Sequence, residues 1–166
     1  MTENAHHKEI LEKPSQIGIK VVIVNPRGEV LLLKRNAAAY GDGLSYWDIP
    51  GGRVDASVDV DEIINEGVVH PELARELHEE INWTPEKDQH IQYVAHQEIV
   101  TSAHENVDRY TFILQTNHDI PIQLSAEHAD YAWVSTDTLK HMENLGRSLK
   151  SLVMDNTIPN FLKPLP

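Results

Sequence analysis

Three glutamates, Glu76, Glu79 and Glu80, crowd the short segment RELHEEINW. Apolar residues recur at helical spacing in HPELARELHEEI, which has a proline in its first turn, so we expect a helix over 70–81. Each residue advances about 100° around a helix axis, which places these carboxylates and that of Glu72 on one stripe. A separate apolar face, suited to packing on a sheet, carries Leu73, Ala74, Leu77 and Ile81.

An acidic helical stripe has three simple interpretations: a solvated face, a surface for a basic partner protein, or a cation site. Exposed carboxylates are common, which favours the first. Like charges three or four residues apart nevertheless repel each other, and a bound cation would remove that repulsion. Mg²⁺ prefers carboxylate and water oxygens and is usually shared between acidic side chains and substrate phosphates. The stripe therefore predicts metal-assisted attack of water on phosphorus.

Composition limits the partners of this site. The chain has 166 residues, with 14 basic against 26 acidic side chains and a formal charge of -12, so a nucleic acid polymer is not expected to bind. A small phosphorylated substrate is compatible, because divalent cations reverse the local charge. The absence of cysteine excludes thiolate chemistry. With no apolar leader and no apolar run of about 18 residues, a cytoplasmic protein without a membrane partner is expected.

The strands and loops ahead of the acidic helix are predicted from runs of apolar residues and from the prolines and glycines that interrupt them. Two apolar runs, Ile19–Val24 and Val30–Leu33, are joined at NPRG and predict a hairpin. NAAAYGDGLSY reads as a loop, and WDIPGG as a short strand that its own proline and glycines end. The stretch 53–69 reads as an insertion with helical character at Asp61–Glu66.

Beyond the acidic helix, further strands are expected at Ile91–Val100, Tyr110–Gln115 and Tyr131–Val134. N-capping residues then predict a C-terminal helix, which Gly146 is able to break, with an apolar face of Leu139, Met142, Leu149, Leu152 and Val153. The proline-rich tail IPNFLKPLP predicts no regular element. The expected organisation is one domain at 17–155, a flexible N-terminal segment at 1–16 and a C-terminal tail at 156–166.

A glycine pair ends WDIPGG, and the predicted helix carries Arg75, Glu76, Leu77, Glu79 and Glu80, followed by Trp83. Together these residues resemble the signature of the Nudix hydrolase (MutT-like) family. A strand ending in LLLKR and the later segment LSAEHADYAWVSTDTL extend the resemblance over about 17–152. It implies an α+β fold, a Nudix-like α/β/α sandwich with a mixed β-sheet.

Two departures from the family pattern stand out. Asn82 replaces the glycine near the end of the signature, a mild change because asparagine also adopts the left-handed conformation. The expected glutamate between the glycines and the arginine is missing, since Val58 and Gly67 occupy its positions and an insertion splits the motif. Glu66 and Glu72 are the nearest replacements for this glutamate, which in the family buttresses the arginine.

The resemblance also implies roles for the signature residues. Glu76 and Glu80 are the expected metal ligands, joined by the backbone carbonyl of Gly51. Glu79 is expected to act as a third ligand or as the group that takes a proton from water. Arg75, part of the catalytic motif, is expected to pair with a carboxylate. The implied cofactor is Mg²⁺, with Mn²⁺ as an alternative.

Residues outside the signature are expected to complete the site. Candidates for a general base on a variable loop are Glu98, Glu105 and Glu127, of which Glu127 has the better sequence context. Arg35 and Arg53 are candidates for contacts to phosphates, and Tyr40 and Tyr46 for stacking on a base. The spacing of His96, His104 and His128 matches no metal motif, so we interpret them as loop or core residues.

The expected function is Mg²⁺-dependent hydrolysis of a pyrophosphate bond in a nucleoside diphosphate linked to another group. Substrates of this type include nucleoside triphosphates, ADP-ribose, dinucleoside polyphosphates and nucleotide sugars. The alternative is a non-catalytic domain of the same fold that binds a nucleotide or ADP-ribose as a sensor. An isoprenoid diphosphate isomerase is expected to need a catalytic cysteine, which this chain lacks. The sequence leaves a homodimer open.

Overall fold

The computed structural model describes residues 16–101 and 103–162. The expected flexible N-terminal segment lies outside these ranges except for Gln16, which begins the first strand. The strands are β1 (Gln16–Val24), β2 (Val30–Arg35), β3 (Trp47–Asp48), β4 (Gly51–Val54), β5 (Gln92–Val100), β6 (Asn106–Gln115) and β7 (His128–Val134). The helices are α2 (Ala37–Tyr40), α3 (Val60–Glu66), α4 (Pro71–Ile81), α5 (Thr136–His141), α6 (Arg147–Met154) and α7 (Thr157–Phe161).

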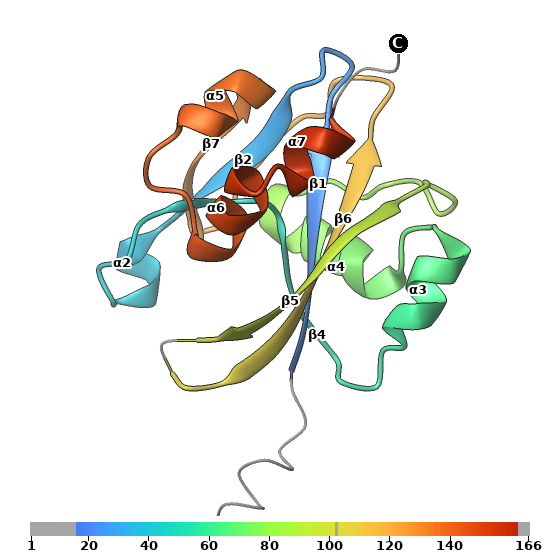
Figure 1. The fold of residues 1–166 in the computed structure, drawn as a ribbon, viewed down its shortest axis with the longest axis horizontal. Coiled ribbons are helices and arrows are strands. Elements are labelled where there is room, and N and C mark those ends of the chain that lie inside the picture. Colours follow the sequence, from blue (N-terminus) through green and yellow to red (C-terminus); the bar gives the residue numbers. More distant parts are fainter. Residues whose placement is uncertain (1–15, 102, 163–166) are drawn as a thin grey trace, which may run out of the picture.

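All of these strands belong to one mixed sheet (Figure 1). Its main path runs β3-β2-β1-β6-β5, while β4 pairs with β1 and β7 pairs with β2. The long central strands β1 and β6 are parallel, and the other pairs are antiparallel. The expected mixed sheet is confirmed.

The sheet opens between β1 and β2 soon after the hairpin turn. These two strands register only at Val24 and Val30, the pair next to the turn. Further along, β1 turns to β4, with Ile17–Lys20 registered on its residues, whereas β2 pairs with β3 and β7. The N–H of Val21 donates to the carbonyl of Pro50 at 2.9 Å, which holds the bend between β3 and β4 inside this opening.

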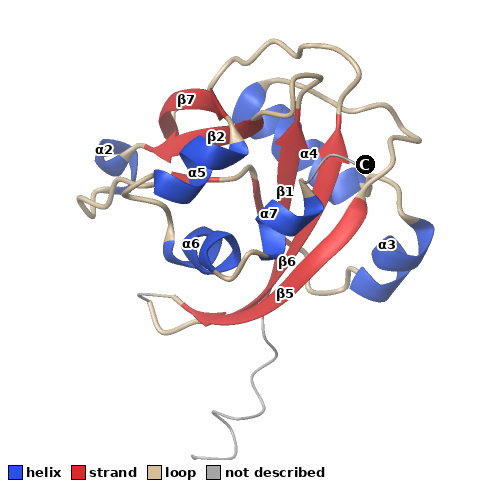
Figure 2. Cartoon of the chain, turned by 45° about the horizontal axis from the view of Figure 1, so that its top comes forward, coloured by secondary structure: helices blue, strands red, loops and turns tan. Residues whose placement is uncertain are grey.

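Helices cover both faces of the sheet (Figure 2). On one face, α3 and α4 enclose a core built from Ile19, Val21, Ile23, Leu31, Phe112, Leu114, Ile63, Leu73, Leu77 and Ile81. On the other, α5, α6 and α7 enclose a core built from Val22, Val24, Val30, Leu32, Ile113, Leu139, Leu149, Leu152 and Ile158. This is the expected α/β/α sandwich. Among the described helices, none is both long and apolar enough to cross a bilayer.

Two predictions ahead of the acidic helix need correction. The glycines of WDIPGG do not end a strand, because Gly51 and Gly52 begin β4 after a sharp bend. The predicted loop after β2 contains the short helix α2, whose first turn is capped by the side chain of Asn36 and whose end is a left-handed Gly41. Within the insertion, the expected helical stretch is confirmed as α3, which Gly67 ends.

The C-terminal region also differs from its prediction. The predicted C-terminal helix is broken into α5 and α6, a break that the sequence allowed at Gly146. The chain between the two helices pairs with β3, where the N–H of Gly146 donates to the Trp47 carbonyl at 2.7 Å. The tail prediction was wrong, since α7 forms there. Pro159 falls in the first turn of α7, where its missing N–H costs no helical hydrogen bond. Burial of Ile158 holds α7 against the second core.

Candidate active site

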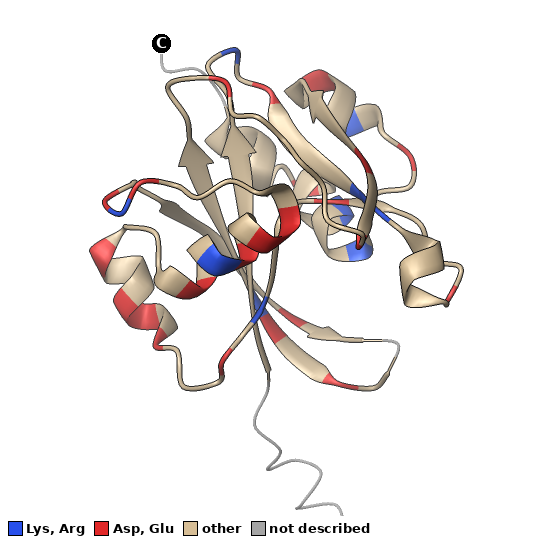
Figure 3. Cartoon of the chain, turned by 180° about the vertical axis from the view of Figure 1, so that it is seen from behind, with Lys and Arg blue, Asp and Glu red and all other residues tan. Residues whose placement is uncertain are grey.

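The acidic helix α4 forms as its sequence predicts. His70 caps its N-terminus, where the imidazole Nδ1 accepts a hydrogen bond from the Glu72 N–H at 3.1 Å. Asn82 ends the helix in the left-handed conformation, with φ of 53°. Figure 3 shows the acidic positions of α4 on the face opposite to that seen in Figure 1.

Glu80 is the buried carboxylate of this helix, with 4% of its surface exposed. Its Oε1 accepts a hydrogen bond of 2.8 Å from the backbone N–H of Gly51, and its Oε2 lies 3.4 Å from Nε2 of His128. Burial raises the pKa of Glu80 to about 7, against the opposing effects of the Lys20 ammonium and the Gly51 N–H. Glu80 thus lies next to the bend that occupies the opening between β1 and β2.

Glu76, one turn earlier, lies over the glycine pair. Burial raises the pKa of its carboxyl, and the Arg75 guanidinium opposes that shift. A Cβ atom on Gly52 would come within 2.5 Å of the Glu76 Oε2, so the carboxylate lies directly against the backbone of β4. The glycine is therefore required for this close approach.

Arg75 pairs with three other carboxylates of α4, all more exposed than that of Glu80. Its guanidinium lies 2.9 Å from Glu72, 3.0 Å from Glu79 and 3.3 Å from Glu76. These contacts agree with the expected pairing of Arg75 with carboxylates. Of the two replacements considered for the missing glutamate, Glu72 contacts the arginine, whereas Glu66 ends α3.

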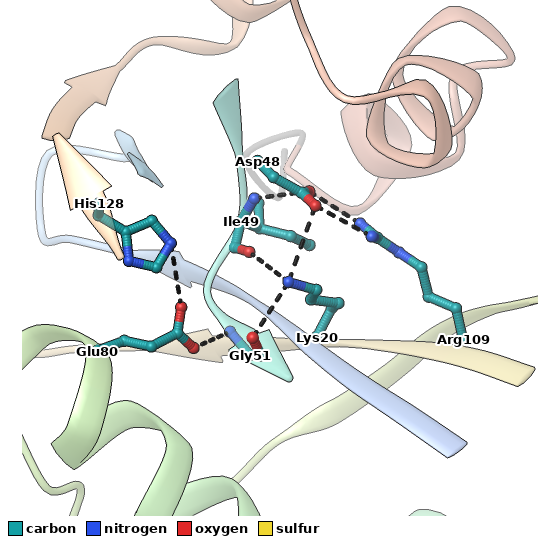
Figure 4. A network of polar contacts seen from close by, with 7 residues as sticks. All are labelled: Lys20, Asp48, Ile49, Gly51, Glu80, Arg109 and His128. Carbon is teal, nitrogen blue, oxygen red and sulfur yellow. Dashed lines mark hydrogen bonds and ion pairs between the residues drawn. The ribbon is translucent and has the colours of Figure 1, made fainter. Parts of the chain in front are cut away.

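A polar network crosses the opening in the sheet (Figure 4). The guanidinium of Arg109, 6% exposed, binds both carboxylate oxygens of Asp48 at 2.9 and 3.1 Å. The Lys20 Nζ donates to the carbonyls of Ile49 at 3.3 Å and Gly51 at 3.1 Å. Burial alone would raise the pKa of Asp48, but Arg109 and Lys20 bring it down to about 2. Asp48 is therefore charged at neutral pH.

These groups line a pocket of about 400 Å³. Most of the predicted site residues meet there, namely Arg35, Tyr40, Tyr46, Gly51, Arg53, Glu76, Glu80 and Glu127. The structure does not bring Arg75 and Glu79 to the pocket wall, and the Glu79 side chain is 55% exposed. Leu33, Ile99 and Val107 give the pocket an apolar side.

The arginines predicted to contact phosphates already have carboxylate partners. Arg35 binds both oxygens of Asp42 at 2.6 Å, and its guanidinium stacks on the Tyr40 ring at 3.7 Å. Arg53 pairs with Glu105 at 2.7 Å. Arg35 and Arg53 therefore both lie at the pocket with their positive charges compensated.

The candidate bases lie in different places. Glu127 is at the pocket wall, and its carbonyl accepts a hydrogen bond from the Asn36 N–H. Glu98 lies on β5, and Glu105 pairs with Arg53. Of these three, Glu127 is the one that lines the pocket.

Sequence reasoning missed five polar residues of the pocket: Lys20, Asp48, Thr101, Arg109 and His128. Lys20 could have been noticed as a charge inside the apolar run QIGIKVVIV. His128 was interpreted as a loop or core residue, yet it begins β7 beside Glu80. Burial lowers the pKa of its imidazole to about 4, so the ring is neutral at pH 7.

The oxygen donors fit a hard divalent cation. Glu76 and Glu80 present carboxylates to one pocket beside the Gly51 carbonyl, and Mg²⁺ usually takes one or two carboxylates together with substrate oxygens. Across residues 16–101 and 103–162, no group of three His, Cys, Asp or Glu side chains could hold a metal ion by itself. The pocket therefore suits a cation that substrate oxygens help to coordinate.

Comparisons with known proteins identify the family and the fold. The NUDIX domain family model matches residues 14–154. The fold is similar to a MutT protein from Methanosarcina mazei Go1, with a TM-score of 0.67 and 26% identity over 90% of this chain and 97% of that one. Among curated proteins, no sequence matches the chain.

Two further structures are similar at lower identity. The NUDIX domain of Shewanella oneidensis NrtR, complexed with ADP ribose, has a TM-score of 0.64 and 16% identity over 98% of this chain and 100% of that one. A Caenorhabditis elegans Ap4A hydrolase in a binary complex has a TM-score of 0.55 and 23% identity over 87% and 97% of the two chains. These likenesses concern the fold.

Proposed function

Because the chain belongs to the NUDIX domain family, we propose that it is a Mg²⁺-dependent hydrolase of a pyrophosphate bond in a nucleoside diphosphate derivative. One observation carries this proposal: the side chains of Glu76 and Glu80, on consecutive turns of α4, line one pocket together with the glycine pair. The similarity to a MutT protein at 26% identity supports it.

The charges of the pocket support the need for a metal ion. Each lysine and arginine that lines the pocket already has a carboxylate partner: Asp48 pairs with both Lys20 and Arg109, Asp42 with Arg35 and Glu105 with Arg53. A polyphosphate would therefore meet paired cations and the carboxylates of Glu76, Glu80 and Glu127. When bound, Mg²⁺ would neutralise phosphate oxygens and lower the pKa of the attacking water.

The chain's own residues would then orient the substrate and move one proton. The Gly51 N–H fixes the direction of the Glu80 carboxylate. Glu127, an exposed carboxylate at the pocket wall, would accept the proton from water. Tyr40 and Tyr46, which line the same pocket, would receive the base.

Some predicted roles are not part of this arrangement. Glu79 as a third ligand or base stays a prediction, since its carboxylate pairs with Arg75 outside the pocket lining. Direct phosphate contacts by Arg35 and Arg53 require their present ion pairs to open. A cytoplasmic location and a homodimer also stay predictions.

A substrate panel tests the proposal. Nucleoside triphosphates, ADP-ribose, dinucleoside polyphosphates and nucleotide sugars are incubated with the protein and Mg²⁺, and products are separated by ion-exchange chromatography. We expect at least one compound to be cleaved between two phosphorus atoms, and excess chelator to stop the cleavage. Cleavage that continues in chelator would contradict the proposed role of Mg²⁺.

The second candidate is a sensor that binds without cleaving. The NrtR NUDIX domain complexed with ADP ribose supports it, because that domain matches nearly the whole of this chain in fold. Saturable binding of ADP-ribose by calorimetry, without any product after prolonged incubation with Mg²⁺, would favour the sensor over the hydrolase.

A further inference from the structure

Lys20 carries a charge in the middle of the apolar central strand β1, where a charged side chain requires polar partners. On β1 it registers with Gly51 on β4 and Thr111 on β6. Its side chain is 20% exposed and extends into the opening of the sheet. The ammonium thus lies among backbone oxygens in the pocket rather than in bulk water.

The Lys20 ammonium contacts oxygen atoms of the kind that a bound metal cation would contact. It donates to the Gly51 carbonyl at 3.1 Å and the Ile49 carbonyl at 3.3 Å, and lies 3.8 Å from Asp48. Figure 4 shows Lys20 reaching toward this bend from one side while Glu80 meets the Gly51 N–H from the other. One peptide segment therefore connects the lysine to the acidic helix.

The Gly51 carbonyl is the oxygen that the proposed metal site would also use. Two cations that share one oxygen at a site as buried as the Lys20 ammonium, whose side chain is 20% exposed, repel each other more strongly than they would in water. Lysine has a compact charge on a flexible stem of four carbons, so its ammonium is able to leave this position without moving β1. The arrangement predicts competition between Lys20 and a divalent cation.

We propose that Lys20 is a placeholder cation, whose ammonium holds the Gly51 carbonyl and offsets the acidic carboxylates until a divalent cation binds. Once displaced, the ammonium is free to donate to an anionic oxygen of the substrate. This inference rests on the proposed function, because it uses the same metal site. In this role the Lys20 ammonium adds a second positive charge at the substrate once metal and substrate are both bound.

Binding of Mn²⁺ tests this role without any substrate. Free Mn²⁺ is measured by electron paramagnetic resonance during titration of the wild type, Lys20→Met and Lys34→Met. Lys34 is the matched control, because it lies on β2 outside the pocket lining, 5.9 Å from the centre of the Trp47 ring. We expect Lys20→Met to bind Mn²⁺ about tenfold more tightly than the wild type, and Lys34→Met to bind it as the wild type does.

Turnover provides the second readout. At saturating metal we expect kcat of Lys20→Met to fall at least tenfold, because the displaced ammonium is no longer available to the substrate. Lys20→Gln keeps a donor for the carbonyls without the charge, and we expect it to show the same tighter Mn²⁺ binding. It replaces Lys20→Met in the test if loss of the pairing with Asp48 impairs folding of the methionine variant.

Weaker or unchanged Mn²⁺ binding in both Lys20 variants would overturn the placeholder role and leave the lysine as a structural support. A different result, wild-type protein that neither binds Mn²⁺ nor cleaves any compound of the panel, would overturn the proposed function itself. The two failures are therefore distinguishable.

Discussion

The backbone N–H of Gly51 donates a 2.8 Å hydrogen bond to Oε1 of Glu80, and this bond ties the bend after β3 to the middle of the acidic helix. It connects residues 29 positions apart in the chain and is buried. A buried hydrogen bond to a carboxylate fixes the carboxylate's direction. The strand that carries the glycines thus helps to orient a proposed metal ligand.

The two glycines should respond differently to alanine. Gly52→Ala would bring a Cβ within 2.5 Å of the Glu76 Oε2, so the carboxylate must move, and we expect roughly tenfold to hundredfold slower cleavage with near-normal stability. Gly51→Ala would collide with the Ile19 backbone at φ of 129°, and should cost about 3 kcal/mol of unfolding free energy. Steady-state kinetics and urea unfolding measure the two effects.

Equal loss of stability in both alanine variants would contradict this separation, since it would mean that Gly52 serves the fold rather than the position of Glu76.

Asp48 should make the protein sensitive to acid. Its pKa is about 2 in the folded protein against an ordinary 3.8, so its stabilisation is complete above about pH 4 and is lost as pH falls toward 2. Asp48→Asn leaves the buried guanidinium of Arg109 without its partner, and we expect a loss of about 3 kcal/mol at pH 7. The difference from the wild type should shrink below pH 4 in denaturant unfolding.

Asp42→Asn is the matched control. The pKa of Asp42 is also lowered to about 2, chiefly by its hydrogen bond to Arg35, but this carboxylate is on the surface. We expect much less loss of stability, because water and salt screen exposed pairs. An equal loss in the two variants would argue against burial as the source of the Asp48 effect.

Asn82 tests the mild departure from the family signature. It ends α4 with φ of 53°, and its side chain donates to Gln123 at 2.9 Å. Asn82→Ala should cost about 1 to 2 kcal/mol, whereas Asn82→Gly should cost less, because glycine adopts this conformation without strain. Thermal unfolding compares the two, and a glycine variant less stable than the alanine variant would refute the conformational explanation.

The acidic helix was predictable because its determinants are local. Leu73, Leu77 and Ile81 repeat at helical spacing, and Pro71 and Asn82 mark its ends within one stretch of sequence. The resemblance to a known family, carried by the same stretch, predicted the sandwich. The sequence therefore identified the helix and the glycine pair that meet at the site.

The network of Lys20, Asp48 and Arg109 was not predictable in this way. Its members come from β1, β3 and β6, and their proximity depends on the pairing of distant strands and on the opening beside β1. The short helix α2 was missed because four residues, even with three alanines, are too few to show a helical period, and the helix depends on its Asn36 cap. The helix α7 was missed because core contacts such as that of Ile158 outweigh its weak helix propensity.

The most direct test of the account compares Glu80→Gln with Glu62→Gln, an exposed position on α3, in Mg²⁺-dependent cleavage of the best substrate. Glutamine keeps the size of the side chain and an acceptor for the Gly51 N–H, so folding should be preserved. We predict that Glu80→Gln lowers kcat roughly hundredfold or more while Glu62→Gln retains wild-type turnover. Wild-type turnover in a correctly folded Glu80→Gln variant would contradict the account.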